Sequence, residues 1–69
     1  MITLVLRQER IKRGWTLEYA AEQIGITKSA FGNIETAKRK PSYDVLCKLE
    51  DIFQETHRRL FAVADGENT

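Results

Sequence analysis

Three polar residues lie on the outward side of a short amphipathic segment. Phe31 and Ile34, three positions apart, direct the opposite side of the segment inward. Lys28, Ser29 and Asn33 are left facing outward. An asparagine side chain can pair with both N6 and N7 of adenine, so such a surface has the chemistry to read base pairs.

The surrounding residues 16–35 have the layout of two short helices joined by a tight turn. Gly25 follows the last apolar position of the first helix, where a helix exit often needs a positive φ. Thr27 can cap the second helix, its hydroxyl accepting from an amide of the first turn. This is the layout of a helix-turn-helix, which fixes the helix face that meets a base pair. The first helix has one apolar face, formed by Leu17, Ala20, Ala21 and Ile24.

Length and composition indicate one small domain. The 69 residues are 42% hydrophobic, enough for a helical core but not for a buried substrate pocket of any size. Cys47 is the single cysteine, which excludes an intrachain disulfide and a cysteine-based metal site; we expect it to be a small core residue. His57 has no partner at ligand spacing, so the sequence predicts no metal or cofactor site and no enzyme.

No apolar run approaches the ~20 residues that span a bilayer, and nothing resembles a signal peptide. A cytoplasmic protein with no membrane partner is therefore expected. The net charge is only +1, but its distribution is uneven. Residues 1–13 and 28–40 each carry +3, whereas residues 14–27 carry −2 and residues 41–69 carry −3. The two basic segments favour an anionic partner, and the acidic remainder can face away from it.

The hydrophobic periodicity predicts an all-α fold of five helices. Gly14 ends the first helix, and Ser42 and Thr56 can cap the last two. We expect a single domain over residues 1–64 and a flexible tail over residues 65–69. The expected helices span residues of about 4–13, 17–24, 28–36, 43–53 and 57–63.

An ordered set of short motifs runs through most of the chain and resembles the phage repressor and Cro-type helix-turn-helix family. The resemblance covers about residues 4–61 and implies a five-helix domain that binds double-stranded operator DNA as a homodimer. The motifs are Arg10-x3-Gly14-Trp15-Thr16, Ala21-x3-Gly25-Ile26-Thr27, Ile34-Glu35, Lys38-Arg39, Pro41-Ser42 and Leu46-x2-Leu49.

By position, the resemblance assigns base reading to Lys28, Ser29 and Asn33, which lie on the helix that enters the major groove in that family. It also implies a structural ion pair between Arg10 and Glu35. The phosphate contacts expected for the chain come from the first helix of the motif, from its turn and from the basic loop that follows, residues 37–42. They are Thr16, Leu17, Thr27, Lys38, Arg39 and Lys40.

Three positions depart from the family pattern. Leu17 stands where many members have a glutamine that helps to hold a phosphate, which leaves only the backbone amides for that contact. Ala37 and Gln54 each replace a glycine that is common after a helix. A positive φ at an alanine costs on the order of 1 kcal/mol, so we expect either local strain or a different turn.

Two further predictions concern close contacts. Gly32 lies within a helix, where glycine costs roughly 1 kcal/mol, so its expected use is close approach of the backbone to DNA. The last two helices carry more apolar side chains than a short terminal helix needs for its own packing, namely Phe53, Leu60 and Phe61. This excess predicts that they take part in a dimer contact.

The residues leave one other class of function open. Small helix-turn-helix proteins also act as antitoxins or as protein-interaction modules. A polar outward face of Lys28, Ser29 and Asn33 favours DNA over a protein partner, for which an apolar face would be expected. The sequence indicates no small-molecule ligand, and it does not separate a repressor from an activator.

Overall fold

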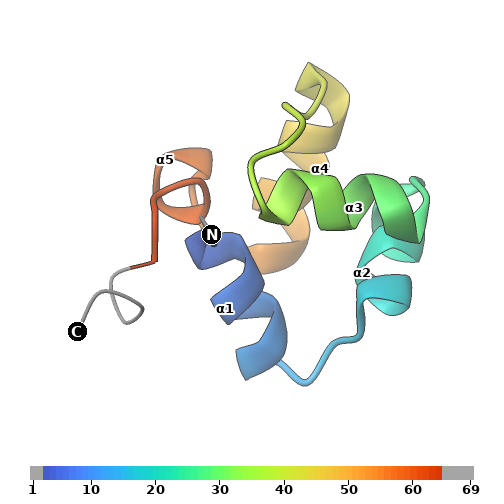
Figure 1. The fold of residues 1–69 in the computed structure, drawn as a ribbon, viewed down its shortest axis with the longest axis horizontal. Helices are drawn as coiled ribbons and strands as arrows, with labels where there is room; N and C mark the ends of the chain where they lie inside the picture. Colours follow the sequence, from blue (N-terminus) through green and yellow to red (C-terminus); the bar gives the residue numbers. More distant parts are fainter. Residues whose placement is uncertain (1–2, 65–69) are drawn as a thin grey trace.

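The computed structural model describes residues 3–64, in which five helices follow one another and no strand longer than a single bridge occurs (Figure 1). The predicted all-α, five-helix fold is confirmed. The expected flexible tail, residues 65–69, lies outside the described residues. None of the helices in the described part is long and apolar enough to cross a membrane. They are α1 (Val5–Lys12), α2 (Leu17–Ile24), α3 (Lys28–Glu35), α4 (Tyr43–Phe53) and α5 (His57–Leu60).

Four of these helices begin at a serine or threonine whose side-chain oxygen accepts a hydrogen bond from the amide three residues later. Each such cap satisfies an amide that has no acceptor within the helix, and contributes about 1 kcal/mol. The caps fix where the helices start, and the expected cap at Thr27 is confirmed. The caps and their donors are Thr16 with Tyr19 (3.0 Å), Thr27 with Ala30 (3.0 Å), Ser42 with Val45 (3.3 Å) and Thr56 with Arg59 (3.4 Å).

A residue with a left-handed backbone lies at or just after the end of each of the first four helices. Gly25 ends α2 with φ of 86°, and the amide of Ile26 donates to the carbonyl oxygen of Ala21 at 3.0 Å. Ala37 and Gln54 have φ of 63° and 56°. Both residues therefore adopt the left-handed backbone conformation that glycine usually occupies. The side chain of Gln54 partly compensates, because Nε2 donates to the carbonyl oxygen of Asp51 at 2.6 Å.

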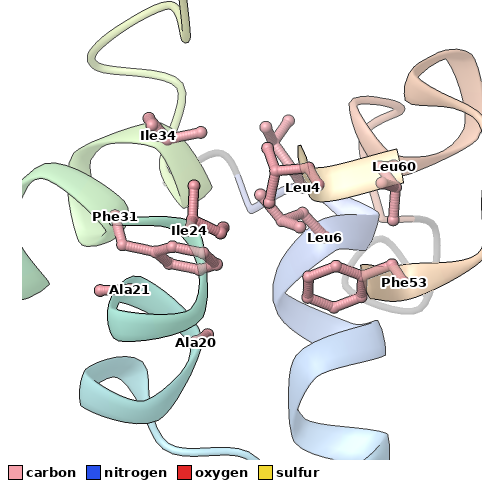
Figure 2. Close-up of a cluster of buried hydrophobic side chains, with 10 residues drawn as sticks. Leu4, Leu6, Ala20, Ala21, Ile24, Phe31, Ile34, Phe53 and Leu60 are labelled. Atoms are coloured by element: carbon pink, nitrogen blue, oxygen red, sulfur yellow. The ribbon is translucent and has the colours of Figure 1, made fainter. Parts of the chain in front are cut away.

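The core lies between the α2–α3 pair on one side and α1, α4 and α5 on the other (Figure 2). Phe31 of α3 and Phe53 of α4 are the two largest fully buried side chains there. Ala20 and Ala21 are also buried, and their small side chains let α3 pack closely on α2. The aliphatic part of this core comprises Leu4, Leu6, Ile24, Ile34, Leu49 and Leu60.

The last helix is shorter than the predicted 57–63, because the chain turns after Leu60 and pairs with the residues before α1. Leu4 and Val63 form an isolated antiparallel bridge. The amide of Val5 donates to the carbonyl oxygen of Ala62 at 2.9 Å. Since α1 has no side-chain cap, this pairing satisfies a donor at its first turn.

Two of the three residues expected in a dimer contact are completely buried within one chain, so the prediction is wrong for these two residues. Phe53 and Leu60 are both 0% exposed within one chain. Phe53 packs edge-on against Trp15, with ring centroids 5.2 Å apart. Phe61 is half-buried and keeps an exposed part, so a dimer contact there stays a prediction.

The expectation that Cys47 is a core residue is also wrong, because its side chain is exposed. Residues two positions apart, such as Cys47 and Leu49, point about 200° apart around a helix. Cys47 therefore lies off the stripe on α4 that ends in the buried Leu49 and Phe53.

A buried ion pair joins α1 to α3. Arg10 Nε donates to Glu35 Oε2 at 2.6 Å, and the two side chains are 10% and 3% exposed. Arg10 Nη1 also donates to the carbonyl oxygen of Trp15 at 2.8 Å, which holds the link between α1 and α2. The backbone carbonyl of Glu35 accepts in turn from the amide of Leu4 at 3.2 Å. The pair expected from the family resemblance is thus present.

We expect Glu35→Ala to lower the free energy of unfolding by about 3–5 kcal/mol, because it leaves a buried guanidinium without its carboxylate. The double variant Arg10→Met with Glu35→Leu should recover much of that loss. Urea denaturation measures both. The control is Glu55→Ala, which removes a partly exposed pair with Arg59 worth about 0–1 kcal/mol. Equal stabilities for Glu35→Ala and Glu55→Ala would contradict the expectation.

A second buried carboxylate, that of Glu9, ties α1 to α5. Its oxygens accept from Arg13 Nη1 at 2.6 Å and from Arg59 Nη2 at 3.1 Å. Arg13 Nη2 also donates to the carbonyl oxygen of Phe53 at 2.7 Å, at the end of α4. The hydrogen bond from Arg13 lowers the pKa of Glu9, with help from the nearby charges and against the effect of burial.

This lowered pKa predicts a pH-dependent contribution to stability. A carboxyl whose folded-state pKa is depressed stabilises the fold above its ordinary pKa and loses that contribution as pH falls through the folded value. Glu9→Gln should therefore be less stable than wild type by a constant amount at neutral pH, with the difference shrinking below about pH 4. Thermal unfolding from pH 7 to pH 3 measures it. A difference that stays constant over this range would show that the charge of Glu9 contributes nothing.

Candidate nucleic-acid interface

The helix-turn-helix is built by α2, its left-handed exit at Gly25 and the capped start of α3. The turn is short because the exit bond from Ile26 and the cap at Thr27 follow each other directly. Lys48 of α4 donates from Nζ to the last carbonyl of α2, that of Ile24, at 3.4 Å. A cation at this end also suits the helix dipole. In Figure 1, α3 crosses in front of α4 and lies above α2.

The outward side of α3 carries the predicted base-reading residues. Lys28 and Ser29 are exposed, and Gly32 and Asn33 are half-buried. At 3.6 residues per turn these four positions fall within an arc of roughly 140°. Phe31 and the other inward residues occupy the remaining side. The structure thus brings Lys28, Ser29 and Asn33 together on one polar surface.

Nothing among residues 3–64 requires a glycine at position 32. Gly32 lies inside α3, and its φ is not in the left-handed region. Apart from the backbone of α3 itself and the two neighbouring residues, a Cβ built there meets no described atom within 4 Å. The absence of a side chain therefore has no explanation in internal packing, and its effect is a smoother outer surface of α3.

The basic loop folds back onto the end of α3. The amides of Lys38 and Arg39 donate to the carbonyl oxygen of Asn33 at 2.8 and 3.2 Å. The left-handed backbone of Ala37 makes this reversal possible. The side chains of Lys38, Arg39 and Lys40 are exposed, so three cations gather beside the polar surface of α3.

The other expected phosphate contacts lie at helix starts. Thr16 and Thr27 use their hydroxyls as caps, and Leu17 is half-buried against the core. Because the side chain of Leu17 has no polar atom, only its backbone amide could contact a phosphate. The first amides of α2 and α3 have no acceptor within their helices and could serve an anion.

Tyr43 is an exposed residue that the sequence reasoning did not single out. It begins α4 directly after the basic loop and is 78% exposed. A side-chain hydrogen bond with Cys47 raises the pKa of Tyr43. The sequence could have indicated this exposure, because Tyr43 lies outside the apolar stripe of α4.

A family model described as a helix-turn-helix matches residues 6–60. This is most of the 69 residues, and the chain belongs to that family. The family resemblance predicted from the motifs is therefore confirmed.

Two relatives from Bacillus subtilis (strain 168) are similar to the chain. The HTH-type transcriptional regulator AnsR is 39% identical over 51 residues, which are 74% of this chain and 44% of that protein. The uncharacterized HTH-type transcriptional regulator YobD is 42% identical over 50 residues, which are 68% of this chain and 45% of that protein. The chain thus spans less than half the length of either relative. No solved structure matches it significantly.

The strain at the start of the basic loop is testable. Ala37→Gly should raise the free energy of unfolding by up to about 1 kcal/mol, because the relief of the left-handed alanine exceeds the added freedom of the unfolded chain. Ala30→Gly, inside α3, is the matched control and should lower stability by about 1 kcal/mol. Both are measured by urea denaturation. Losses of the same size in both variants would mean that Ala37 is unstrained.

Proposed function

We propose that this chain is a sequence-specific, double-stranded DNA-binding transcriptional regulator. The observation that carries the proposal is the polar surface of α3, which a helix-turn-helix presents beside three exposed cations. A recognition helix of this kind lies in the major groove and reads base edges. The names of the two relatives support a regulatory role.

Each residue has a distinct part in the proposal. Lys28, Ser29 and Asn33 read bases, since lysine pairs with guanine and asparagine with adenine. Gly32 lets the backbone of α3 approach the sugar-phosphate edge or a thymine methyl group. The remaining contacts hold phosphates and fix the register of the protein on the duplex. They come from Lys38, Arg39 and Lys40 and from the helix starts at Thr16, Leu17 and Thr27.

We further propose a repressor that acts as a homodimer on a two-fold operator. Eight residues of recognition helix reach only a few base pairs, too few to select a site in a genome. Two copies on half-sites about 34 Å apart would double the sequence that is read. Occupancy of such a site in a promoter would exclude other proteins from it.

Asn33→Ala should relax the preference at one base pair of each half-site, at a cost of about 1–3 kcal/mol there. The probe is a duplex enriched from a random library by wild-type protein, and the measurement is fluorescence anisotropy on it and on its single-base variants. Unchanged selectivity in a variant with an unchanged circular dichroism spectrum would exclude Asn33 as a reader.

The matched comparison is Lys40→Ala, which removes a phosphate contact. It should weaken binding to selected and random duplexes alike and reduce the log–log salt slope by about one. An effect of Lys40→Ala on one sequence only would reassign the loop to base reading.

Gly32→Ala separates fold from binding. The added methyl group meets open space in the chain and removes a glycine from a helix, so the melting temperature should rise. Affinity for the selected duplex should fall, because the methyl group stands where the DNA comes close. Calorimetry and anisotropy on the same sample measure both. Tighter or equal DNA binding by Gly32→Ala would rule out close approach at this position.

A further inference from the structure

A groove lies between α3, the basic loop and the first turns of α4, and it also reaches the turn of the helix-turn-helix at Ile26. Its volume is about 310 Å³. This is about twice the ~150 Å³ that holds a benzene molecule, so the groove has room for about ten non-hydrogen atoms. Small-molecule sites usually have volumes of about 300–1,000 Å³. The groove is therefore large enough for a small organic ligand.

The floor of the groove is aliphatic. Ile34 is 3% exposed and lies at the edge of the core cluster (Figure 2). Ile26 and Val45 are half-buried and pack against the same core. Ala30 and Pro41 complete the apolar lining, to which residues 3–64 contribute no aromatic side chain. An aromatic ligand would find no ring to pair with, so the floor suits an aliphatic chain better.

The rim of the groove is cationic. Arg39 and Lys40 line the side that the basic loop forms, and both are exposed. Neither forms an ion pair with a carboxylate of residues 3–64, and no acidic side chain from this part of the chain lines the groove. Ser42 lines the same side. Its Oγ accepts from the amide of Val45 at 3.3 Å, and a hydroxyl that accepts can still donate its proton. An anionic group would therefore meet two cations and a hydroxyl donor.

The basic loop is fixed on both sides of these cations. The amide of Arg39 donates to the carbonyl oxygen of Asn33 at 3.2 Å, and Ser42 caps α4. Only Lys40 and Pro41 lie between the two anchors, and the ring of Pro41 fixes its own φ. A site whose backbone is already ordered loses less conformational freedom when a ligand binds.

We infer that the groove binds a medium-chain aliphatic carboxylate, with the chain on the aliphatic floor and the carboxylate at Arg39 and Lys40, and that this ligand competes with DNA. The inference rests on the DNA-binding function proposed above and adds a small molecule that regulates it. Arg39 and Lys40 are proposed phosphate contacts, so a carboxylate that they hold takes the place of DNA phosphates. Each ligand then weakens the other by the same factor. An eight-carbon carboxylate, with about ten non-hydrogen atoms, matches the volume.

The binding test is a titration of octanoate into the DNA-free protein, labelled with ¹³C at the isoleucine and valine methyl groups. The signals of Ile26, Ile34 and Val45 should shift together and saturate. Those of Ile11 and Val63, which are 50% and 52% exposed elsewhere, should not move. Hexanoate should bind about 10-fold more weakly, because it buries two methylene groups fewer. Octanol should also bind about 10-fold more weakly, because it has no charge for the cations.

Two variants separate the floor from the rim. Val45→Met places a longer side chain in the groove and should weaken octanoate binding by about 10-fold, without a change in DNA affinity when octanoate is absent. Val5→Met introduces the same side chain at another half-buried valine, on α1, and is the matched control that keeps octanoate binding. Lys40→Gln should weaken the binding of octanoate but not that of octanol. Circular dichroism establishes that each variant is folded.

The regulatory test is fluorescence anisotropy on the duplex selected by wild-type protein. Octanoate that saturates the methyl shifts should lower DNA affinity by at least about 5-fold. Acetate at the same concentration keeps the ionic strength equal and should have no such effect. Methyl shifts of equal size at Ile11 and Val63, wild-type octanoate binding by a folded Val45→Met, or unchanged DNA affinity of the octanoate-saturated protein would each overturn the inference. Absence of DNA binding without octanoate would refute the proposed function instead, because the methyl titration contains no DNA.

Discussion

The arrangement of the domain depends on the ion pair between Arg10 and Glu35. One guanidinium contacts a carboxylate on α3 and the carbonyl oxygen of Trp15, so it sets α1, the following link and α3 relative to one another. Both charges are buried, and desolvation makes any other placement of either side chain costly. Phe31 and Ile34 fill the core on the same side of α3. The outward direction of α3 is therefore a consequence of what its inward side must bury.

Because the inward side of α3 makes the core contacts, the side chains on its outer side have no part in packing. Lys28 and Ser29 are exposed, and a Cβ built at Gly32 would have no described atom outside the α3 backbone within 4 Å. The fold constrains the positions of these residues and the core constrains their direction, but neither constrains their identity. Such a surface can change its sequence without loss of the domain, as expected for a site carried on a stable scaffold.

Sequence reasoning located elements that are determined locally. The bounds of α2 and α4 follow from Thr16, Ser42 and the left-handed exits, all of which act within a few residues. It missed the end of α5, because pairing between Leu4 and Val63 joins distant parts of the chain. It also assigned Phe53 and Leu60 to a dimer contact, because their apolar character is visible in the sequence but their burial under Trp15 and the core is not. The Arg10–Glu35 pair came from family resemblance, since spacing alone does not pair residues on different helices.

The eight-residue length of α3 has one further consequence. Helices shorter than about 12–15 residues are marginal in water on their own, because nucleation costs more than so few hydrogen bonds return. The outer surface of α3 therefore exists only while the whole core is assembled, and a peptide of its sequence would not reproduce it. Ligand occupancy and the folding equilibrium are then thermodynamically linked: whatever binds α3 protects the entire domain from thermal unfolding and proteolysis, and unfolding releases it in one cooperative step.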